Sequence, residues 1–167
     1  MKKILTLLFA FTICFVCNAQ ERVKYFQFSG YKAVFIPSDT FLIKIGHPEL
    51  GNAKTHGQTF TLTIKDPEGK MPKDTVLIYT DRVRGINLNF SELIMDKQIV
   101  SDSLSISMAS SHGSIHVKAN YLKVSAKAGS NIDVKGQANY FEYYTKAYSS
   151  INTDQLQTVH TQRKKTE

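Results

Sequence analysis

Four polar residues each follow an isoleucine at an equivalent point of a repeated pattern, and their types could do chemistry. They are Asn87, His116, Asp133 and Asn152. If successive copies stack as strands in register, these side chains lie about 4.8 Å apart along one outer face. His116 beside Asp133 could then act as a base with an orienting carboxylate, or as half of a metal site. The simpler interpretation is a row of outward polar positions that hydrogen-bond between coils, and the sequence favours it because no further acid or base is evident on that line.

The histidines give little support to metal chemistry. His112 and His116 have the i, i+4 spacing that places two ligands on one face of a helix, but a Gly-Ser corner lies between them. His47, His56 and His160 have no partner nearby in the sequence. There is also no Gly-x-Ser-x-Gly elbow and no phosphate-binding glycine-rich loop. We therefore predict no metal site, no cofactor and no catalytic residues.

Tyrosines are concentrated in the last part of the chain. Exposed tyrosines offer rigid, half-polar faces to a sugar ring or to a protein partner. Alternatively, Phe141 and Tyr143 fill the core while their neighbours cap the last coil, and the sequence favours this cap. The candidate binding residues are Tyr140, Tyr144, Tyr148, His116 and Asp133.

The elements that would position these residues are three copies of one pattern. The copies lie at 103–119, 121–138 and 140–156. Each copy reads as an alternating strand, a small-residue corner and an isoleucine that opens a second strand. The corner isoleucines Ile115, Ile132 and Ile151 are 17 and then 19 residues apart. A repeat of this size carried on strands is typical of a β-solenoid, in which each coil buries its inward side chains by stacking on the next. The sequence predicts an all-β, single-stranded β-helix with a period of about 17–19 residues in its C-terminal half.

Period-two alternation assigns one face of each strand to the core. The predicted inward residues are Leu104, Ile106, Met108, Ile115, Val117, Leu122, Val124, Ala126, Ile132, Val134, Phe141, Tyr143 and Ile151. Earlier strands are predicted within 21–36, at 41–45, 60–64 and 76–79, and 84–88 resembles the later corners. No segment has a sustained 3.6-residue apolar period, so we expect almost no helix.

Residues 1–19 have the form of a secretory signal peptide. A basic start is followed by an apolar run at 4–16 and a small residue at Ala19. The alternatives are a retained anchor or a lipoprotein, but bulky Ile and Val precede the two cysteines where a lipoprotein signal needs a small residue. No later segment approaches the roughly 20 apolar residues of a spanning helix, so we expect no transmembrane segment after cleavage. The expected location is the periplasm, the outer surface or the medium.

Cleavage would leave 148 residues (167 − 19) without cysteine. That length suits one domain, which we expect at 20–156. Residues 157–167 contain a single apolar residue, Val159, and are predicted to be a disordered, basic polar tail. The formal charge is +7, but the lysines are scattered along alternating strands rather than gathered in a stripe. We therefore expect no nucleic-acid partner.

Three features of the chain match those of a known family. Residues 22–30 resemble its opening strand with a Phe-Ser-Gly turn, residues 56–64 resemble its central strand, and the Ser/Gly-Ser/Asn-Ile repeats resemble its later coils. The family is the putative auto-transporter adhesin head GIN domain of exported bacterial proteins, and the resemblance covers roughly 22–156. It implies a β-helix-like fold and an adhesin role, with no catalytic residues to carry over. The chain departs from the family in its shortness, its tyrosine-rich last coil and its few acidic corner residues.

These observations predict an exported binding protein whose partner is a glycan, an envelope or surface protein, or another copy of itself. The alternative is a carbohydrate-active enzyme, a polysaccharide lyase or hydrolase, that uses the face of His116 and Asp133. Three or more titratable side chains converging in a concave groove would favour the enzyme. Flat ladders without such a groove would favour binding.

Overall fold

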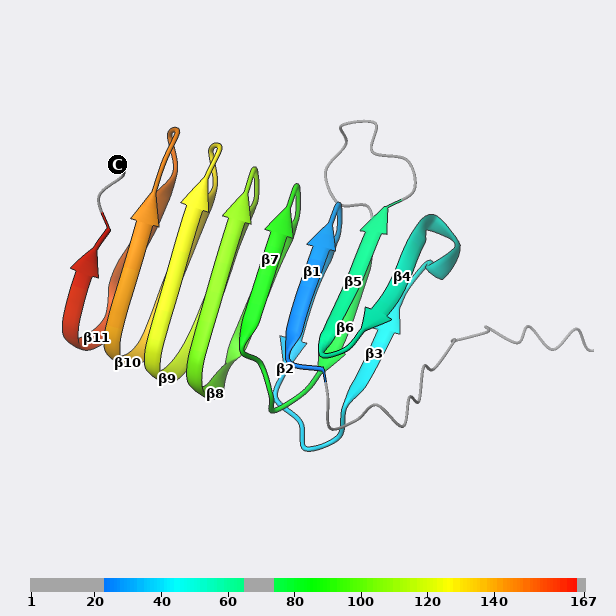
Figure 1. The fold of residues 1–167 in the computed structure, drawn as a ribbon, viewed down its shortest axis with the longest axis horizontal. Helices are drawn as coiled ribbons and strands as arrows, with labels where there is room; N and C mark the ends of the chain where they lie inside the picture. The colour runs from blue at the N-terminus through cyan, green and yellow to red at the C-terminus, as the bar shows by residue number, and fades with distance from the viewer. Residues whose placement is uncertain (1–22, 65–73, 165–167) are drawn as a thin grey trace, which may run out of the picture.

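The computed structural model describes residues 23–64 and 74–164, which form one curled sheet with the shape of a solenoid (Figure 1). The predicted signal peptide lies outside the described residues. The strands are β1 (Tyr25–Ser29), β2 (Lys32–Ile36), β3 (Leu42–Ile45), β4 (Gly51–His56), β5 (Thr59–Ile64), β6 (Thr75–Tyr79), β7 (Gly85–Asn89), β8 (Glu92–Ala109), β9 (His112–Lys127), β10 (Asn131–Thr145) and β11 (Ser150–Arg163). The predicted all-β solenoid is confirmed.

Helix is almost absent from the described part of the chain. Its only helical element there is the single 3₁₀ turn η1 at Pro48–Leu50. Within 23–64 and 74–164, no helix is long and apolar enough to cross a membrane.

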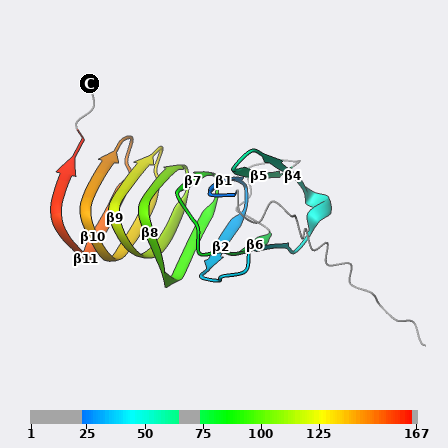
Figure 2. The same ribbon diagram turned by 60° about the horizontal axis from the view of Figure 1, so that its bottom comes forward.

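The C-terminal half is a regular stack of four long strands. Strands β8 to β11 pair in parallel with one another, and each curves round the core so that one strand makes most of a coil (Figure 2). Ile132 lies opposite Ile151, as the repeat predicts. Ile115, however, lies opposite Val134, and Ile132 lies opposite Gly113. The step from β9 to β10 is therefore 19 residues rather than the 17 that separate Ile115 from Ile132.

The predicted inward face is correct although the predicted register is wrong. An offset of two residues returns each side chain to the same face of a strand, because side chains alternate with period two. Eleven of the thirteen predicted inward residues are buried. Tyr143 and Ile151 are half-buried and pack against the core near the last coil.

A serine turns each coil at one corner, and its side chain satisfies the backbone there. The four residues are Ser91, Ser111, Ser130 and Ser149. The N–H of Ser111 donates to Ser130 Oγ at 3.1 Å, and Ser130 Oγ donates to the Lys127 carbonyl at 2.6 Å. The N–H of Ser130 in turn donates to Ser149 Oγ at 3.0 Å. Ser91, Ser111 and Ser130 are buried. The hydrogen bonds of this serine ladder therefore join adjacent coils where water cannot replace them.

The N-terminal half does not stack in chain order. The first coil, β1 and β2, lies inside the stack: β1 pairs with β5 on one side and β7 on the other, and β2 pairs with β6 and β8. Strands β3 and β4 then add antiparallel to β6 and β5. The segment predicted as a corner at 84–88 is strand β7, whose five residues pair along both β1 and β8.

The polar tail is another difference from the sequence prediction. Residues 157–163 are the second half of β11 and pair with β10 as far as Arg163, instead of being disordered. Gln157 bonds to Gln137 across the coils, and His160 stacks on Tyr140. Backbone pairing and outward polar contacts thus extend the strand without buried apolar residues, and composition alone does not show them.

Candidate functional site

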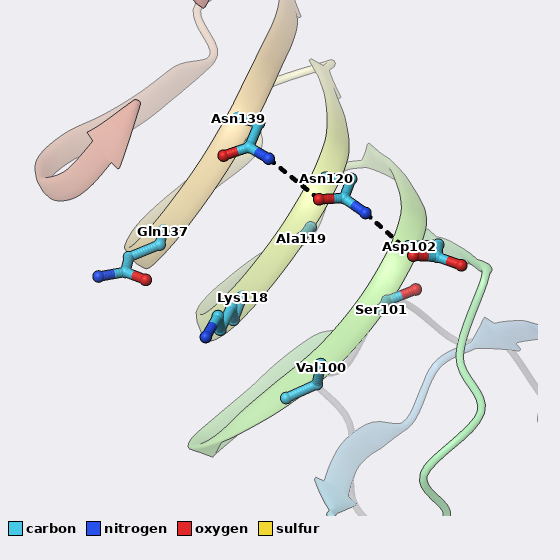
Figure 3. Close-up of a pocket in the computed structure, with 8 residues that line it drawn as sticks. All are labelled: Val100, Ser101, Asp102, Lys118, Ala119, Asn120, Gln137 and Asn139. Carbon is cyan, nitrogen blue, oxygen red and sulfur yellow. Dashed lines mark hydrogen bonds between the residues drawn. The ribbon is translucent and has the colours of Figure 1, made fainter. Parts of the chain in front are cut away.

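A pocket of about 280 Å³ lies on the outer surface where β8, β9 and β10 bend (Figure 3). We call it the amide groove. Its lining residues are Val100, Ser101, Asp102, Lys118, Ala119, Asn120, Gln137 and Asn139. Asp102 and Lys118 are the only charged residues in this lining, and their charges are opposite.

The wall of the groove is a row of hydrogen-bonded side chains that crosses three coils. Asn139 Nδ2 donates to Asn120 Oδ1 at 3.0 Å, and Asn120 Nδ2 donates to Asp102 Oδ1 at 3.0 Å. Figure 3 shows the Asn139 oxygen and the second Asp102 oxygen pointing away from this row. The row is therefore fixed by its own bonds while it still presents donors and acceptors to solvent.

Small residues allow the strands to bend beneath the groove. Ala119 and Ala138 are paired with each other and buried, directly before Asn120 and Asn139. Gly136 has φ +111°, and a Cβ at this position would collide with the Val117 carbonyl. Only glycine lets β10 approach β9 in this conformation.

An aromatic row borders the groove. Tyr121 and Tyr140 pair across β9 and β10, and each directly follows one of the groove asparagines. The rings of Tyr140 and His160 stack with centroids 4.9 Å apart and planes 23° apart. Tyr140 is 54% exposed and Tyr121 is 38% exposed. We call Tyr121, Tyr140 and His160 the tyrosine ladder.

Glu142 fixes one member of the tyrosine ladder, Tyr121, and is an ionised carboxylate. Tyr121 Oη donates to Glu142 Oε2 at 2.7 Å, and the ammonium groups of Lys123 and Lys164 lie 2.9 and 3.3 Å from Oε1. The hydrogen bond from Tyr121 and then that from Lys123 lower the pKa of Glu142 to about 2. A carboxylate with so low a pKa stays ionised at neutral pH, whereas a glycosidase acid needs a raised pKa.

The sequence-predicted pair of His116 and Asp133 is not formed. His116 lies opposite Lys135, and Asp133 lies opposite Ser114, two positions away along the strand. His116 instead faces a bulge of β8, where its Nε2 is 3.4 Å from the Gln98 amide nitrogen and its Nδ1 is 3.4 Å from the Asp96 carbonyl. The cause is again the 19-residue step, because the two residues are only 17 apart in the sequence.

The observed register keeps only part of the predicted polar row together. Asp133 accepts a hydrogen bond from Asn152 Nδ2 at 3.1 Å, so this part of the polar ladder exists. Asn87 lies opposite Gln27 and Ser107, on other strands. In the described residues no three His, Cys, Asp or Glu side chains are grouped to hold a metal ion.

The three predicted binding tyrosines occupy different places. Tyr140 borders the amide groove. Tyr144 lies four residues further along β10, with the Lys127 ammonium 5.5 Å from its ring centroid. Tyr148 is fully exposed in the turn between β10 and β11. The structure does not gather these three residues into one site.

Sequence reasoning missed the groove residues Asp102, Asn120 and Asn139, although a signal for two of them exists. The tripeptide Ala-Asn-Tyr occurs at 119–121 and again at 138–140, 19 residues later. This identity gives the true step from β9 to β10 and places both Asn-Tyr pairs on one outer edge.

Comparison with known proteins gives the fold and the family. No curated protein matches the chain. A putative adhesin from Bacteroides fragilis NCTC 9343 has a similar structure, with a TM-score of 0.73 and 14% identity over 84% of this chain and 71% of that one. A putative adhesin from Parabacteroides merdae ATCC 43184 gives 0.56 and 14%, over 84% and 72% of the two chains. A putative lipid binding protein from Parabacteroides distasonis ATCC 8503 gives 0.58 and 11%, over 84% and 74%.

The family model agrees with these structures and with the resemblance seen in the sequence. The model described as putative auto-transporter adhesin, head GIN domain, matches residues 28–165, which include the amide groove and the tyrosine ladder. The chain therefore belongs to the head GIN domain family of putative auto-transporter adhesins.

Proposed function

We propose that this protein is an exported, non-catalytic binding protein that holds a neutral glycan in the amide groove and against the tyrosine ladder. The observation that carries the proposal is the hydrogen-bonded row of Asp102, Asn120 and Asn139 beside the exposed rings of Tyr121 and Tyr140. The signal-like residues 1–19 and the adhesin names of the family and its neighbours support export and binding.

The chemistry of this surface suits a sugar. A pyranose ring has an apolar face that packs on an aromatic ring and hydroxyl groups around its edge that both donate and accept. Each asparagine amide of the groove offers two donors and an acceptor, and Asp102 offers acceptors. Tyr121 and Tyr140 directly follow Asn120 and Asn139. A single sugar ring could therefore contact a tyrosine ring and an asparagine amide together.

The charge of the groove favours a neutral ligand. Asp102 and Lys118 balance each other in the lining. The lining therefore has no net charge that would attract an anionic or a cationic ligand. The same polar lining does not suit an acyl chain, although one structural neighbour is named a putative lipid binding protein.

The geometry supports binding better than catalysis. General acid–base cleavage of a glycosidic bond needs two carboxyl groups with separated pKa values across the substrate. The groove lining holds a single carboxylate, Asp102, and Glu142 nearby is ionised and paired with two lysines. His116 and Asp133 do not form the pair that the enzyme hypothesis needs.

The test is a glycan array probed with the protein purified from the periplasm of an expression host, followed by affinity electrophoresis in gels that contain a polysaccharide found on the array. We expect retardation by a neutral glycan that changes little with salt, and loss of retardation for Asn139→Ala and for Tyr140→Ala. Leu50→Ala, which trims an exposed side chain at the far end of the sheet, is the matched control. Full retardation of both groove variants would contradict the proposal.

A further inference from the structure

The turns β1–β2, β7–β8, β8–β9, β9–β10 and β10–β11 form a row along one edge of the solenoid (Figure 1). Each turn contains a residue with positive φ directly before the corner. These residues are Gly30 (+80°), Phe90 (+48°), Ser110 (+48°), Gly129 (+75°) and Tyr148 (+59°). We call them the tip row.

Backbone hydrogen bonds hold neighbouring tips in line. The N–H of Gly30 donates to the Asn89 carbonyl at 3.1 Å, and the N–H of Phe90 donates to the Ala109 carbonyl at 3.1 Å. The N–H of Gly129 donates to the Ala147 carbonyl at 2.8 Å. The tips are thus a fixed edge of the molecule.

Two members of the tip row have side chains that the fold does not need. Phe90 is 63% exposed and Tyr148 is fully exposed. A bulky side chain at positive φ is disfavoured, and glycine is the residue that suits it, as at Gly30 and Gly129. Unfavourable backbone geometry combined with an aromatic ring in solvent points to a contact outside the molecule.

The surroundings of these rings are basic. Lys127 and Lys146 flank the tips at Gly129 and Tyr148 and are exposed. No Asp or Glu occurs in the turn segments 89–91, 109–111, 127–130 and 145–149. The acid nearest to these segments in the sequence, Glu92, is paired with Lys32 at 3.4 Å. The edge therefore offers two aromatic rings and two cations without a compensating anion in these segments.

We propose that the tip row docks on the surface of an anionic phospholipid bilayer. Phe90 and Tyr148 enter the headgroup region, where aromatic rings are favoured, and Lys127 and Lys146 face the lipid phosphates. The two rings are three coil steps apart, about 14 Å, so one flat surface contacts both. Two rings and two lysines make this attachment weak and reversible. It leaves the amide groove free, since the groove lies at the bend of the strands and not in the turns.

The experiment is cosedimentation of the periplasmically purified protein with vesicles of phosphatidylglycerol and phosphatidylethanolamine, and with vesicles of pure phosphatidylcholine. We expect binding to the anionic vesicles that weakens with added salt, and much less binding to phosphatidylcholine. The double variant Phe90→Gly with Tyr148→Gly should lower binding to the phosphatidylcholine level. The double variant Lys127→Gln with Lys146→Gln should lose most of the salt-sensitive part of its binding to anionic vesicles.

The melting temperatures of the glycine variants show whether these proteins still fold. Glycine suits positive φ, so their melting temperatures should be equal to or above that of the wild type. Val159→Ala, which trims a 70% exposed apolar side chain away from the turns, should bind vesicles as the wild type does. Equal vesicle binding by the double glycine variant, or no wild-type binding to anionic vesicles, would overturn the proposal. Asn139→Ala should leave vesicle binding unchanged, which separates this edge from the glycan groove.

Discussion

Asn139 Nδ2 donates a 3.0 Å hydrogen bond to Oδ1 of Asn120, the residue at the same bend of the preceding coil. Two identical side chains meet because the coils are 19 residues apart at this point. The groove is therefore a product of stacking: each of three coils contributes one side chain, and no coil holds the row alone. Anything that weakens coil stacking should also weaken ligand binding.

The serine ladder should be most sensitive to change at its centre. Ser130→Ala leaves the buried N–H of Ser111 without its acceptor, so we expect a loss of about 1–3 kcal/mol in the free energy of unfolding. Ser149 lies nearer solvent, and Ser149→Ala should cost less. Denaturant titration of both variants measures the difference. Equal losses would mean that burial of the ladder does not matter.

A charge in the core should unfold the stack. Ile132 is 2% exposed and lies between Gly113 and Ile151 on the adjacent coils. Ile132→Asp buries an unpaired carboxylate and should cost several kcal/mol. Circular dichroism and thermal melting test this, with Asn131→Asp on the outward neighbour as the control. A soluble, cooperatively melting Ile132→Asp protein would show that the inward assignment is wrong.

Stability should fall in acid because of Glu142. The pKa of this carboxyl is lowered in the folded protein from the usual 4.5 to about 2. A lowered pKa contributes stability above the unfolded value, and that contribution is lost as pH falls through the folded value. We therefore expect the melting temperature to decrease between pH 4.5 and 2 in part through Glu142. Glu142→Gln should flatten this part of the pH profile; an unchanged profile would assign the acid sensitivity to other groups.

Removal of residues 157–167 should lower the melting temperature. The truncation deletes the second half of β11, and with it the cover that this strand gives to β10 from Gln137 to Tyr143. It also removes Lys164 from Glu142 and His160 from Tyr140. Removal of 165–167 alone, which leaves β11 complete, is the control. If the longer truncation melts like the full chain, the second half of β11 contributes no stability.

Alternation in the sequence predicted the inward face correctly, but the corner isoleucines predicted the wrong register. Alternation fixes which side of a strand is apolar, and a slip of two residues preserves it. The corner isoleucines suggested a 17-residue step, while the repeated Ala-Asn-Tyr at 119–121 and 138–140 gives the observed 19. Because the polar rows on the outer face depend on exact register, the predicted meeting of His116 and Asp133 failed while that of Asp133 and Asn152 was correct.

The order of strands in the N-terminal half has no local signal. Phe26 pairs with Phe60 on one side and Ile86 on the other, partners far away in the sequence. Each of these strands alternates like any half-buried strand, so alternation does not select its neighbour. The core contact of Phe28 with Phe60, whose ring centroids are 6.2 Å apart, follows from that long-range choice.

The most direct test of glycan binding in the groove is a backbone-amide NMR titration of the labelled protein with a neutral oligosaccharide found on the array. We predict that the largest shift changes occur at Asn120, Tyr121, Asn139 and Tyr140, and that Asn139→Ala abolishes them. Shift changes confined to the region of His116 and Asp133, or to the turns of the tip row, would contradict a glycan site in the amide groove.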